Sequence, residues 1–309
     1  MNVYQLIPEM VSYWGMIASK MSVPVKFLLS LLLLVIFGIL LAYLIAGHPI
    51  PLVHTKGLIA TRERNLMLTA TLLMLIIVVP VLVLTFAIAW RYRAENTRAA
   101  YRPEWDHSLL AESIWWSIPC VIISALAIIT WNSTHQLDPS KAVAGTGKSI
   151  TIQVVALPWK WLFIYPEQQI ASVNMVRFPT NAPVTFIITA DAPMNSFSIP
   201  ELSGQIYAMP GMSTELNMIA DQDGTYRGQS ASISGAGFAG MTFTAQSSSE
   251  QDFTDWVSTV KKGATVLNTE SYTALAVPSA NTPASTFATA ENGMYAHVLS
   301  SYMSPNTPM

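Results

Sequence analysis

Cysteine and charge are both scarce in this chain. Cys120 is the single cysteine among 309 residues, so neither a disulfide framework nor a cysteine-based metal site can form. It lies within an apolar run, where we expect it to pack as a small side chain. Charged residues make up 11% of the sequence and hydrophobic residues 51%, whereas soluble domains average about 25% charged residues. This composition excludes an ordinary soluble protein and indicates a chain anchored in a membrane.

The few charges divide unevenly along the sequence. Residues 1–137 contain nine Lys and Arg against six Asp and Glu, and residues 138–309 contain seven against twelve. The acidic second part lacks the basic face that a nucleic-acid partner requires. We therefore expect no nucleic acid among the partners of this protein.

Three uncharged, apolar runs organise the first half of the chain, at residues 27–47, 65–90 and 113–137. Each run is long enough to cross a hydrocarbon core of about 30 Å as a helix. By the positive-inside tendency, the basic segment between the second and third runs faces the cytoplasm, which sends the chain after residue 137 to the opposite side. The basic residues of that segment are Arg91, Arg93, Arg98 and Arg102.

After residue 137 the pattern changes to short runs with a period near two. Residues 149–155 alternate between apolar and polar side chains, and residues 183–189 do so less strictly. Clusters of Gly, Pro, Asn and Asp separate such runs, which is typical of an antiparallel β-sandwich. We assign residues 146–250 to this domain. The tail, residues 251–309, begins with apolar residues at helical spacing and continues through an aromatic-rich stretch; the helical set is Phe253, Trp256, Val257 and Val260.

Two segments of the predicted sandwich follow a copper-binding pattern but lack its ligands. Residues 228–241, GQSASISGAGFAGM, are similar to the G-Q-C-S-E-x-C-G-x-x-H-x-x-M run of cytochrome c oxidase subunit II, which holds a two-copper centre. Residues 195–200, NSFSIP, are similar to its H-S-[FW]-x-[VI]-P segment. The two cysteine positions are taken by Ser230 and Ser234, the glutamate by Ser232, the two histidines by Asn195 and Phe238, and the methionine remains as Met241.

Copper of this type requires thiolates and imidazoles, which serine and phenylalanine do not supply. A preserved frame without ligands resembles subunit II of the cytochrome bo-type ubiquinol oxidases, members of the haem-copper oxidase superfamily. The aromatic-rich tail is a second likeness to that class. The resemblance implies a membrane-anchored α+β chain. Its expected parts are a signal or signal-anchor segment over 1–48, a transmembrane helical hairpin over 65–137, a cupredoxin-like periplasmic domain without the copper centre over 146–250, and a C-terminal extension over 251–309.

The densest aromatic cluster is WKWLFIYP, residues 159–166. In cytochrome c oxidases a similar W-x-W segment receives electrons from cytochrome c. Without copper behind it, an electron arriving here has no nearby acceptor. We therefore interpret Trp159 and Trp161 as structural residues that fill the domain core and its contact with a partner subunit.

One carboxylate is a candidate for proton chemistry. Glu112 begins the segment ESIWWSIP at the cytoplasmic end of the third apolar run. The segment resembles the E-x-x-W-[TS]-x-P signature of the family, whose glutamate lies at the mouth of a proton-uptake channel in the catalytic subunit. A carboxylate at a membrane interface is placed to collect protons, and the alternative is an acid that only stabilises the start of a helix. The histidines show no metal-ligand spacing and are expected at the surface or at interfaces: His48, His54, His107, His135 and His297.

The first apolar run has two open interpretations. It ends at residues 45–48, IAGH, which match a bacterial lipoprotein signal except that His48 stands where a lipidated cysteine is needed. The run is either retained as an extra helix or cleaved by another protease, and Met21 is a possible true start.

We expect a non-catalytic subunit of a proton-pumping ubiquinol oxidase of the bacterial inner membrane. The resemblance implies that this chain binds no cofactor, and that subunit I holds the haems, the active-site copper and the quinol. Subunit I, the small subunits III and IV and membrane lipid are the expected partners, and cytochrome c is not one. The alternatives are a membrane-tethered cupredoxin-like carrier or assembly factor, and a cytochrome c oxidase subunit II. The type of quinone and the haem types stay open.

Overall fold

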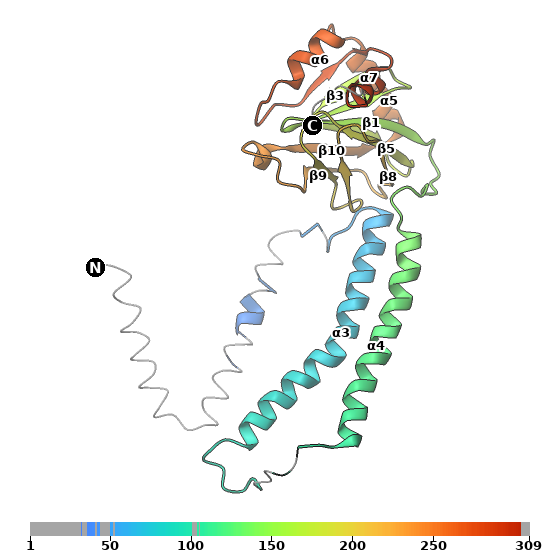
Figure 1. The fold of residues 1–309 in the computed structure, drawn as a ribbon. Helices are drawn as coiled ribbons and strands as arrows, with labels where there is room; N and C mark the ends of the chain where they lie inside the picture. The colour runs from blue at the N-terminus through green and yellow to red at the C-terminus, as the bar shows by residue number, and fades with distance from the viewer. Residues whose placement is uncertain are drawn as a thin grey trace, which may run out of the picture. The chain divides into compact units, whose positions relative to one another are not determined.

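The computed structural model describes residues 32, 36–40, 42–43, 50–51, 53–100, 104 and 106–303. The chain divides into two units, Met1–His54 and Thr55–Met309, and the elements named below belong to the second (Figure 1). The predicted signal or anchor segment over 1–48, with His48 at its end, lies largely outside the described residues.

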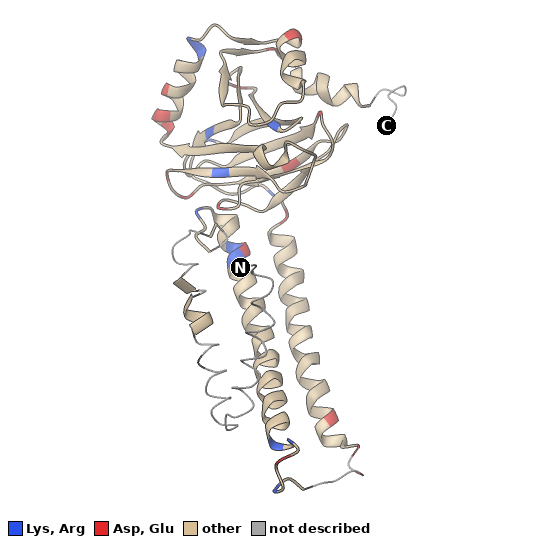
Figure 2. Ribbon diagram, turned by 90° about the vertical axis from the view of Figure 1, so that its left-hand side faces the viewer, with Lys and Arg blue, Asp and Glu red and all other residues tan. Residues whose placement is uncertain are grey.

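Two long helices form the predicted hairpin. Helix α3 spans Leu58–Arg91 and helix α4 spans Leu109–Gln136, and the two contact each other. Each contains a proline, at Pro80 and Pro119. Both helices are long and apolar enough to cross a membrane, and through most of their length they carry no Lys, Arg, Asp or Glu (Figure 2).

Helix α3 starts at Leu58, seven residues before the apolar run that predicted it. Contacts of its first turn with the β-domain explain the difference. The backbone N–H of Lys56 donates to the carbonyl of Glu201 at 2.8 Å, and that of Ala60 donates to the carbonyl of Leu202 at 3.2 Å. These bonds attach the start of α3 to the β-domain, so the helix begins before the uncharged run.

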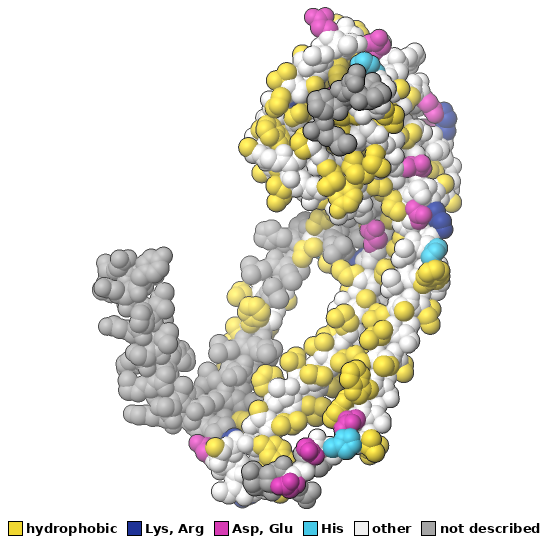
Figure 3. All heavy atoms as spheres, viewed as in Figure 1, with side chains coloured by type: hydrophobic (Ala, Val, Ile, Leu, Met, Phe, Trp, Pro, Cys, Tyr) yellow, Lys and Arg dark blue, Asp and Glu magenta, His cyan; other side chains and the backbone are white. Residues whose placement is uncertain are grey.

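Apolar side chains on the helices face outward. Ala60 and Ile122 are the buried residues of α3 and α4, whereas many leucines, isoleucines and valines lie exposed along them (Figure 3). Cys120 is exposed on α4, which corrects the expectation of a packed residue. The physical reason is that two helices cover only one face of each other.

The predicted β-sandwich is confirmed, with most strands paired antiparallel. One sheet has the order β12-β3-β2-β1-β5-β8 and the other β4-β10-β9-β6-β7. Two pairings, β1 with β5 and β10 with β4, are parallel, which short-range alternation does not reveal. The strands are β1 Ile150–Leu157, β2 Lys160–Tyr165, β3 Ile170–Val173, β4 Met175–Pro179, β5 Val184–Ala190, β6 Asn195–Ser198, β7 Gln205–Ala208, β8 Thr214–Met218, β9 Gly224–Ser230 and β10 Thr242–Ser248.

An aromatic cluster fills the space between the sheets. Trp161 is completely buried and meets the ring of Phe197 edge-on at 5.3 Å between centroids. Phe197 stacks on Phe243 at 5.1 Å. Since β2, β6 and β10 each contribute one of these rings, the cluster joins the two sheets and positions β6 against the end of β9.

The tail adds helices and short strands to the outside of the sandwich. Helix α5 buries Phe253, Trp256, Val257 and Val260, so the predicted helical pattern is confirmed. Strand β12 extends the six-stranded sheet by pairing with β3. The elements are α5 Glu250–Lys261, β11 Val266–Leu267, α6 Thr269–Ala276, β12 Ser285–Phe287, β13 Thr289–Ala290 and α7 Met294–Ser301, and a short 3-10 turn, η1 Phe238–Gly240, precedes β10.

Candidate functional site

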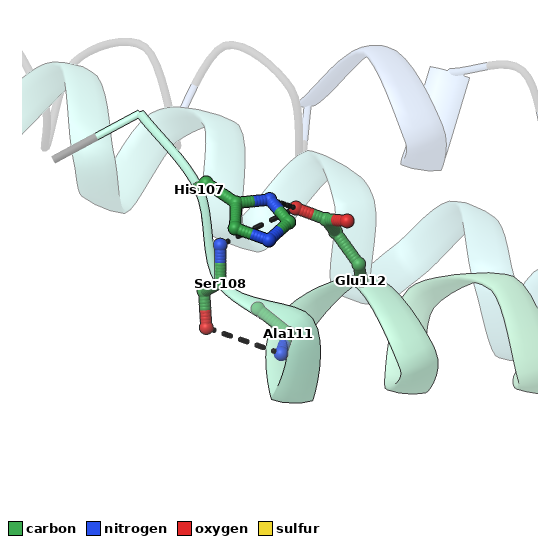
Figure 4. Close-up of polar contacts among 4 residues, drawn as sticks. All are labelled: His107, Ser108, Ala111 and Glu112. Atoms are coloured by element: carbon green, nitrogen blue, oxygen red, sulfur yellow. Dashed lines mark hydrogen bonds and ion pairs between the residues drawn. The ribbon is translucent and has the colours of Figure 1, made fainter.

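Glu112 lies in the first turn of α4 (Figure 4). Ser108 is the N-cap, and its hydroxyl accepts the backbone N–H of Ala111 at 3.4 Å. The carboxylate of Glu112 reaches back, and its Oε1 accepts the backbone N–H of Ser108 at 3.3 Å. Reciprocal bonds of this kind satisfy N–H groups that a helix start leaves unpaired.

The same oxygen has a second partner. Nδ1 of His107 lies 2.6 Å from Oε1 of Glu112. The side chains of His107 and Glu112 are 60% and 36% exposed, so water reaches both. Glu112 therefore stabilises the start of α4 and contacts an imidazole that water also reaches.

The contact of His107 with Glu112 was not predicted, because nothing in the spacing of the five histidines distinguishes His107 from the others. Its partner is five residues away across a helix N-cap, a spacing that helical periodicity does not single out. The signal that could have found the contact is the cap at Ser108, because side chains at the residue before an N-cap and at the fourth residue of the helix commonly pack on each other.

Two of the former copper-ligand positions are in direct contact. Asn195 begins β6 and Ser230 ends β9, and these strands pair antiparallel. The hydroxyl of Ser230 contacts Oδ1 of Asn195 at 3.1 Å and the carbonyl oxygen of Ser232 at 3.2 Å. The amide of Asn195 also donates to the carbonyl of Pro193 at 2.7 Å. Asn195 is 1% exposed and Ser230 is 5% exposed, so polar groups that are bonded to each other occupy this position.

The loop between β9 and β10 closes on itself through its backbone. The N–H of Ser230 donates to the carbonyl of Met241 at 3.2 Å, and the N–H of Met241 donates to the carbonyl of Phe238 at 2.9 Å. Met241 is 1% exposed and belongs to the sandwich core. Ser232, Ser234 and Phe238 are partly exposed.

The donors at these positions do not fit a binuclear copper centre. They are an amide, hydroxyls, a phenyl ring and one thioether, and the thioether of Met241 is packed in the core. Such a centre requires thiolates and imidazoles. Within the part of the chain that the structure describes, no three His, Cys, Asp or Glu side chains gather as a possible metal site.

Trp159 packs on this loop, whereas Trp161 lies in the core. The indole N–H of Trp159 donates to the carbonyl of Ser234 at 3.1 Å. A Cβ at Gly237 would lie 2.4 Å from the ring of Trp159. The ring thus lies so close to the backbone of Gly237 that a residue with a side chain would clash with it. The loop thus requires glycine where it meets Trp159.

Comparison with known families finds two matches along the chain. Residues 148–248 match the family described as "Cytochrome C oxidase subunit II, periplasmic domain". Residues 261–306 match the family described as "COX Aromatic Rich Motif".

Individual relatives cover most of the chain. It is 50% identical over 261 residues to a protein of Pseudomonas aeruginosa named "Cytochrome bo(3) ubiquinol oxidase subunit 2", covering 84% of this chain and 79% of that one. It is 44% identical to "Ubiquinol oxidase subunit 2" of Acetobacter aceti, covering 86% and 87%. Among solved structures, the periplasmic domain of cytochrome oxidase subunit II of Bradyrhizobium japonicum covers 38% of this chain and 98% of its own, with 24% identity and a TM-score of 0.36.

Proposed function

Because the chain belongs to the family of cytochrome bo(3) ubiquinol oxidase subunit 2, we propose that it is a non-catalytic subunit of an oxidase that uses ubiquinol to reduce oxygen to water and pumps protons. Besides the family, the main support for this proposal is the set of side chains at the positions that align with copper ligands. Asn195 and Ser230 bond to each other where a copper ligand pair is needed. Electrons therefore bypass this chain and pass from quinol to the haems of the catalytic subunit.

We further propose that Glu112 and His107 collect protons for the catalytic subunit. Their contact of 2.6 Å and their exposure to water support this role. A proton taken up by His107 can pass to Glu112, which lies at the start of an apolar helix where ionisable groups commonly serve proton pathways. Replacing His107 with Ala removes the first acceptor and keeps the second, so turnover should fall less in His107→Ala than in Glu112→Ala.

The remaining parts of the chain fit anchoring and capping roles. The outward-facing apolar side chains of α3 and α4 suit a contact with subunit I and lipid, and the β-domain suits a periplasmic position. The Arg-rich segment between the helices then faces the cytoplasm, which places Glu112 on the side from which protons are taken up. The small subunits III and IV complete the complex in the bacterial inner membrane.

Purification of the intact complex through a tag on this chain tests the proposal. We expect a haem-containing large subunit to co-purify, and the complex to oxidise ubiquinol but not reduced cytochrome c. Purification without a haem protein would support a free-standing carrier or assembly factor instead. Rapid oxidation of cytochrome c would contradict the absence of a copper centre.

A further inference from the structure

The C-terminal strap, defined here as residues 262–303, covers a face of the sandwich that would otherwise be an apolar surface. Helices α6 and α7 lie on the outside of the sandwich, next to β3 (Figure 1). Together with outward-facing side chains of β1, β2 and β3 they form a second hydrophobic cluster, separate from the core between the sheets. The sheet residues of that cluster are Val155, Leu157, Leu162, Ile164, Ala171 and Val173.

One carboxylate holds both helices of the strap. Oδ2 of Asp191 accepts the hydroxyl of Tyr272, in α6, at 2.5 Å. Its Oδ1 accepts the hydroxyl of Tyr302, just after α7, at 2.6 Å. Asp191 directly follows β5, so a single side chain of the sandwich bonds to two points of the strap that are 30 residues apart in sequence. Hydrogen bonds to an ionised carboxylate are short and strong.

A buried lysine holds the end of α6. Lys160, at the start of β2, is 2% exposed. Its ammonium donates to the carbonyls of Leu275 and Val277, both at 2.8 Å. These carbonyls belong to the last turn of α6 and the residue after it, where a helix leaves acceptors unpaired and attracts a positive charge. Leu275 and Val277 both belong to the strap, so the strap supplies hydrogen-bond acceptors to this buried cation.

A third contact fixes the segment between α6 and β12. The side-chain amide of Asn174 donates to the carbonyl of Thr282 at 2.7 Å, while its Oδ1 accepts the backbone N–H of Trp161 at 2.8 Å. Asn174 has a positive φ of 53°, a conformation that asparagine tolerates better than most residues. The strap is therefore bonded to the sandwich at its beginning, middle and end.

We propose that the two helices of the strap, α6 and α7, open and close on the sandwich together, with Asp191 as their latch, while β12 between them stays paired with β3. Loss of the carboxylate frees α6 and α7 together, because both tyrosines depend on it. Opening uncovers the apolar outer face of β1, β2 and β3 and exposes Lys160 to water. The same opening releases the loop between β5 and β6, since Asp191 is the first residue of that loop.

Hydrogen–deuterium exchange of this subunit within the intact oxidase tests the latch. In Asp191→Ala the backbone amides of α6 and of α7 should exchange faster by a common factor on the order of 10 or more, from the loss of two bonds to a charged group. Glu270→Gln is the matched control, because Glu270 is an exposed acid on α6 itself, and it should leave both helices unchanged. Equal exchange in Asp191→Ala and in the control would overturn the proposal.

Tyr302→Phe and Tyr272→Phe carry the test if Asp191→Ala does not assemble, because each keeps its ring. Each should speed the exchange of both helices. Acceleration confined to α7 in Tyr302→Phe, or to α6 in Tyr272→Phe, would show two independent elements and refute the joint opening of the two helices.

Acylation of Lys160 gives a second readout at the far end of the strap. With N-hydroxysuccinimidyl acetate, Lys160 should react slowly in the wild-type complex relative to the exposed Lys262. In Tyr302→Phe its reactivity should rise by the same factor as the exchange of α6. Unchanged reactivity of Lys160 while α6 exchanges faster would contradict the joint opening of α6 and α7.

Discussion

Replacing Glu112 with Gln separates the proton-collecting role that we propose for this residue from its bond at the start of α4. The Gln carbonyl oxygen can still accept the N–H of Ser108 and face His107, so the start of α4 keeps its bonds. What the amide cannot do is bind and release a proton. The N-cap bond from Ala111 to Ser108 is untouched in either case.

The structural effect of this change is small enough to leave assembly intact. The ion pair between Glu112 and His107 is exposed to water at 36% and 60%, and exposed pairs contribute about 0–1 kcal/mol to stability. A helix of 28 residues packed against α3 does not depend on such a term. A large fall in turnover in Glu112→Gln therefore reports proton transfer.

We expect turnover of Glu112→Gln to fall roughly 10-fold. An enclosed proton-transfer group typically contributes ~100-fold or more, but at this exposed site water provides other routes for protons. Oxygen consumption with ubiquinol measures turnover, and stopped-flow absorbance measures haem reduction. The first haem reduction should keep its wild-type rate, while steps that take up protons slow down. Glu112→Asp should recover part of the rate, since it keeps the acid at a shorter reach.

Asp106→Asn is the matched control, because Asp106 is an exposed carboxylate in the same segment. It should turn over like the wild type. If Glu112→Gln also turns over like the wild type from neutral to alkaline pH, Glu112 is only a helix-start acid. If it slows the first haem reduction instead, the residue acts on electron transfer and the reasoning fails.

Three other changes test the domain. The wild-type chain should bind no mixed-valence copper pair. A variant with the ligands restored should bind copper and show the near-infrared absorption and seven-line paramagnetic spectrum of such a pair. Failure of this variant to take up copper would mean that the loop backbone has diverged as well. The restoring substitutions are Asn195→His, Ser230→Cys, Ser232→Glu, Ser234→Cys and Phe238→His. Burial and the bond to Asp191 raise the pKa of Tyr302 to about 12 and also raise that of Tyr272. The folded state favours the neutral phenols, so the contribution of Tyr302 to the stability of the fold is complete below about pH 10, the ordinary tyrosine pKa, and is lost as pH rises toward 12. The tyrosinate absorbance of the wild type minus that of Tyr302→Phe measures the titration of this residue. A midpoint near pH 10 would disprove the raised pKa. Gly228→Ala should destabilise the domain by about 1–3 kcal/mol through overpacking, because its Cβ would lie 2.0 Å from the ring of Phe243. Thermal denaturation measures the loss. Gly224→Ala is the control, because its Cβ would lie 3.1 Å from the nearest atom, the hydroxyl of Tyr226.

The sequence predicted the parts of the fold that local patterns determine. Uncharged runs gave α3 and α4, alternation gave β1 and β5, and helical spacing gave the four buried residues of α5. The start of α3 at Leu58 was not predictable from hydropathy, because its first turn is held by residues more than 140 positions later in the chain.

Contacts between distant segments account for what the sequence did not predict. A lysine between two tryptophans reads as an exposed position in a strand, yet Lys160 is buried because the strap supplies two carbonyls from residues 115 and 117 positions away. His107 is near Glu112 in sequence, but its partner is set by the geometry of the cap. Asn195 and Ser230, by contrast, could be expected near each other, because both align with ligand positions of one copper centre in the pattern that the sequence resembles.

The contact between Asn195 and Ser230 joins β6 to the end of β9 at two positions that align with copper ligands. In the copper-binding pattern, Asn195 and Ser230 stand at positions that hold ligands of one centre. Here the hydroxyl of Ser230 makes the link with Oδ1 of Asn195, and Trp159 covers the rest of the loop through its bond to Ser234. Asp191, at the other end of the loop before β6, is held by the strap. The strap thus bonds, from outside the sandwich, to the first residue of the loop that leads to β6, and the contact of Asn195 with Ser230 holds the other end of that loop.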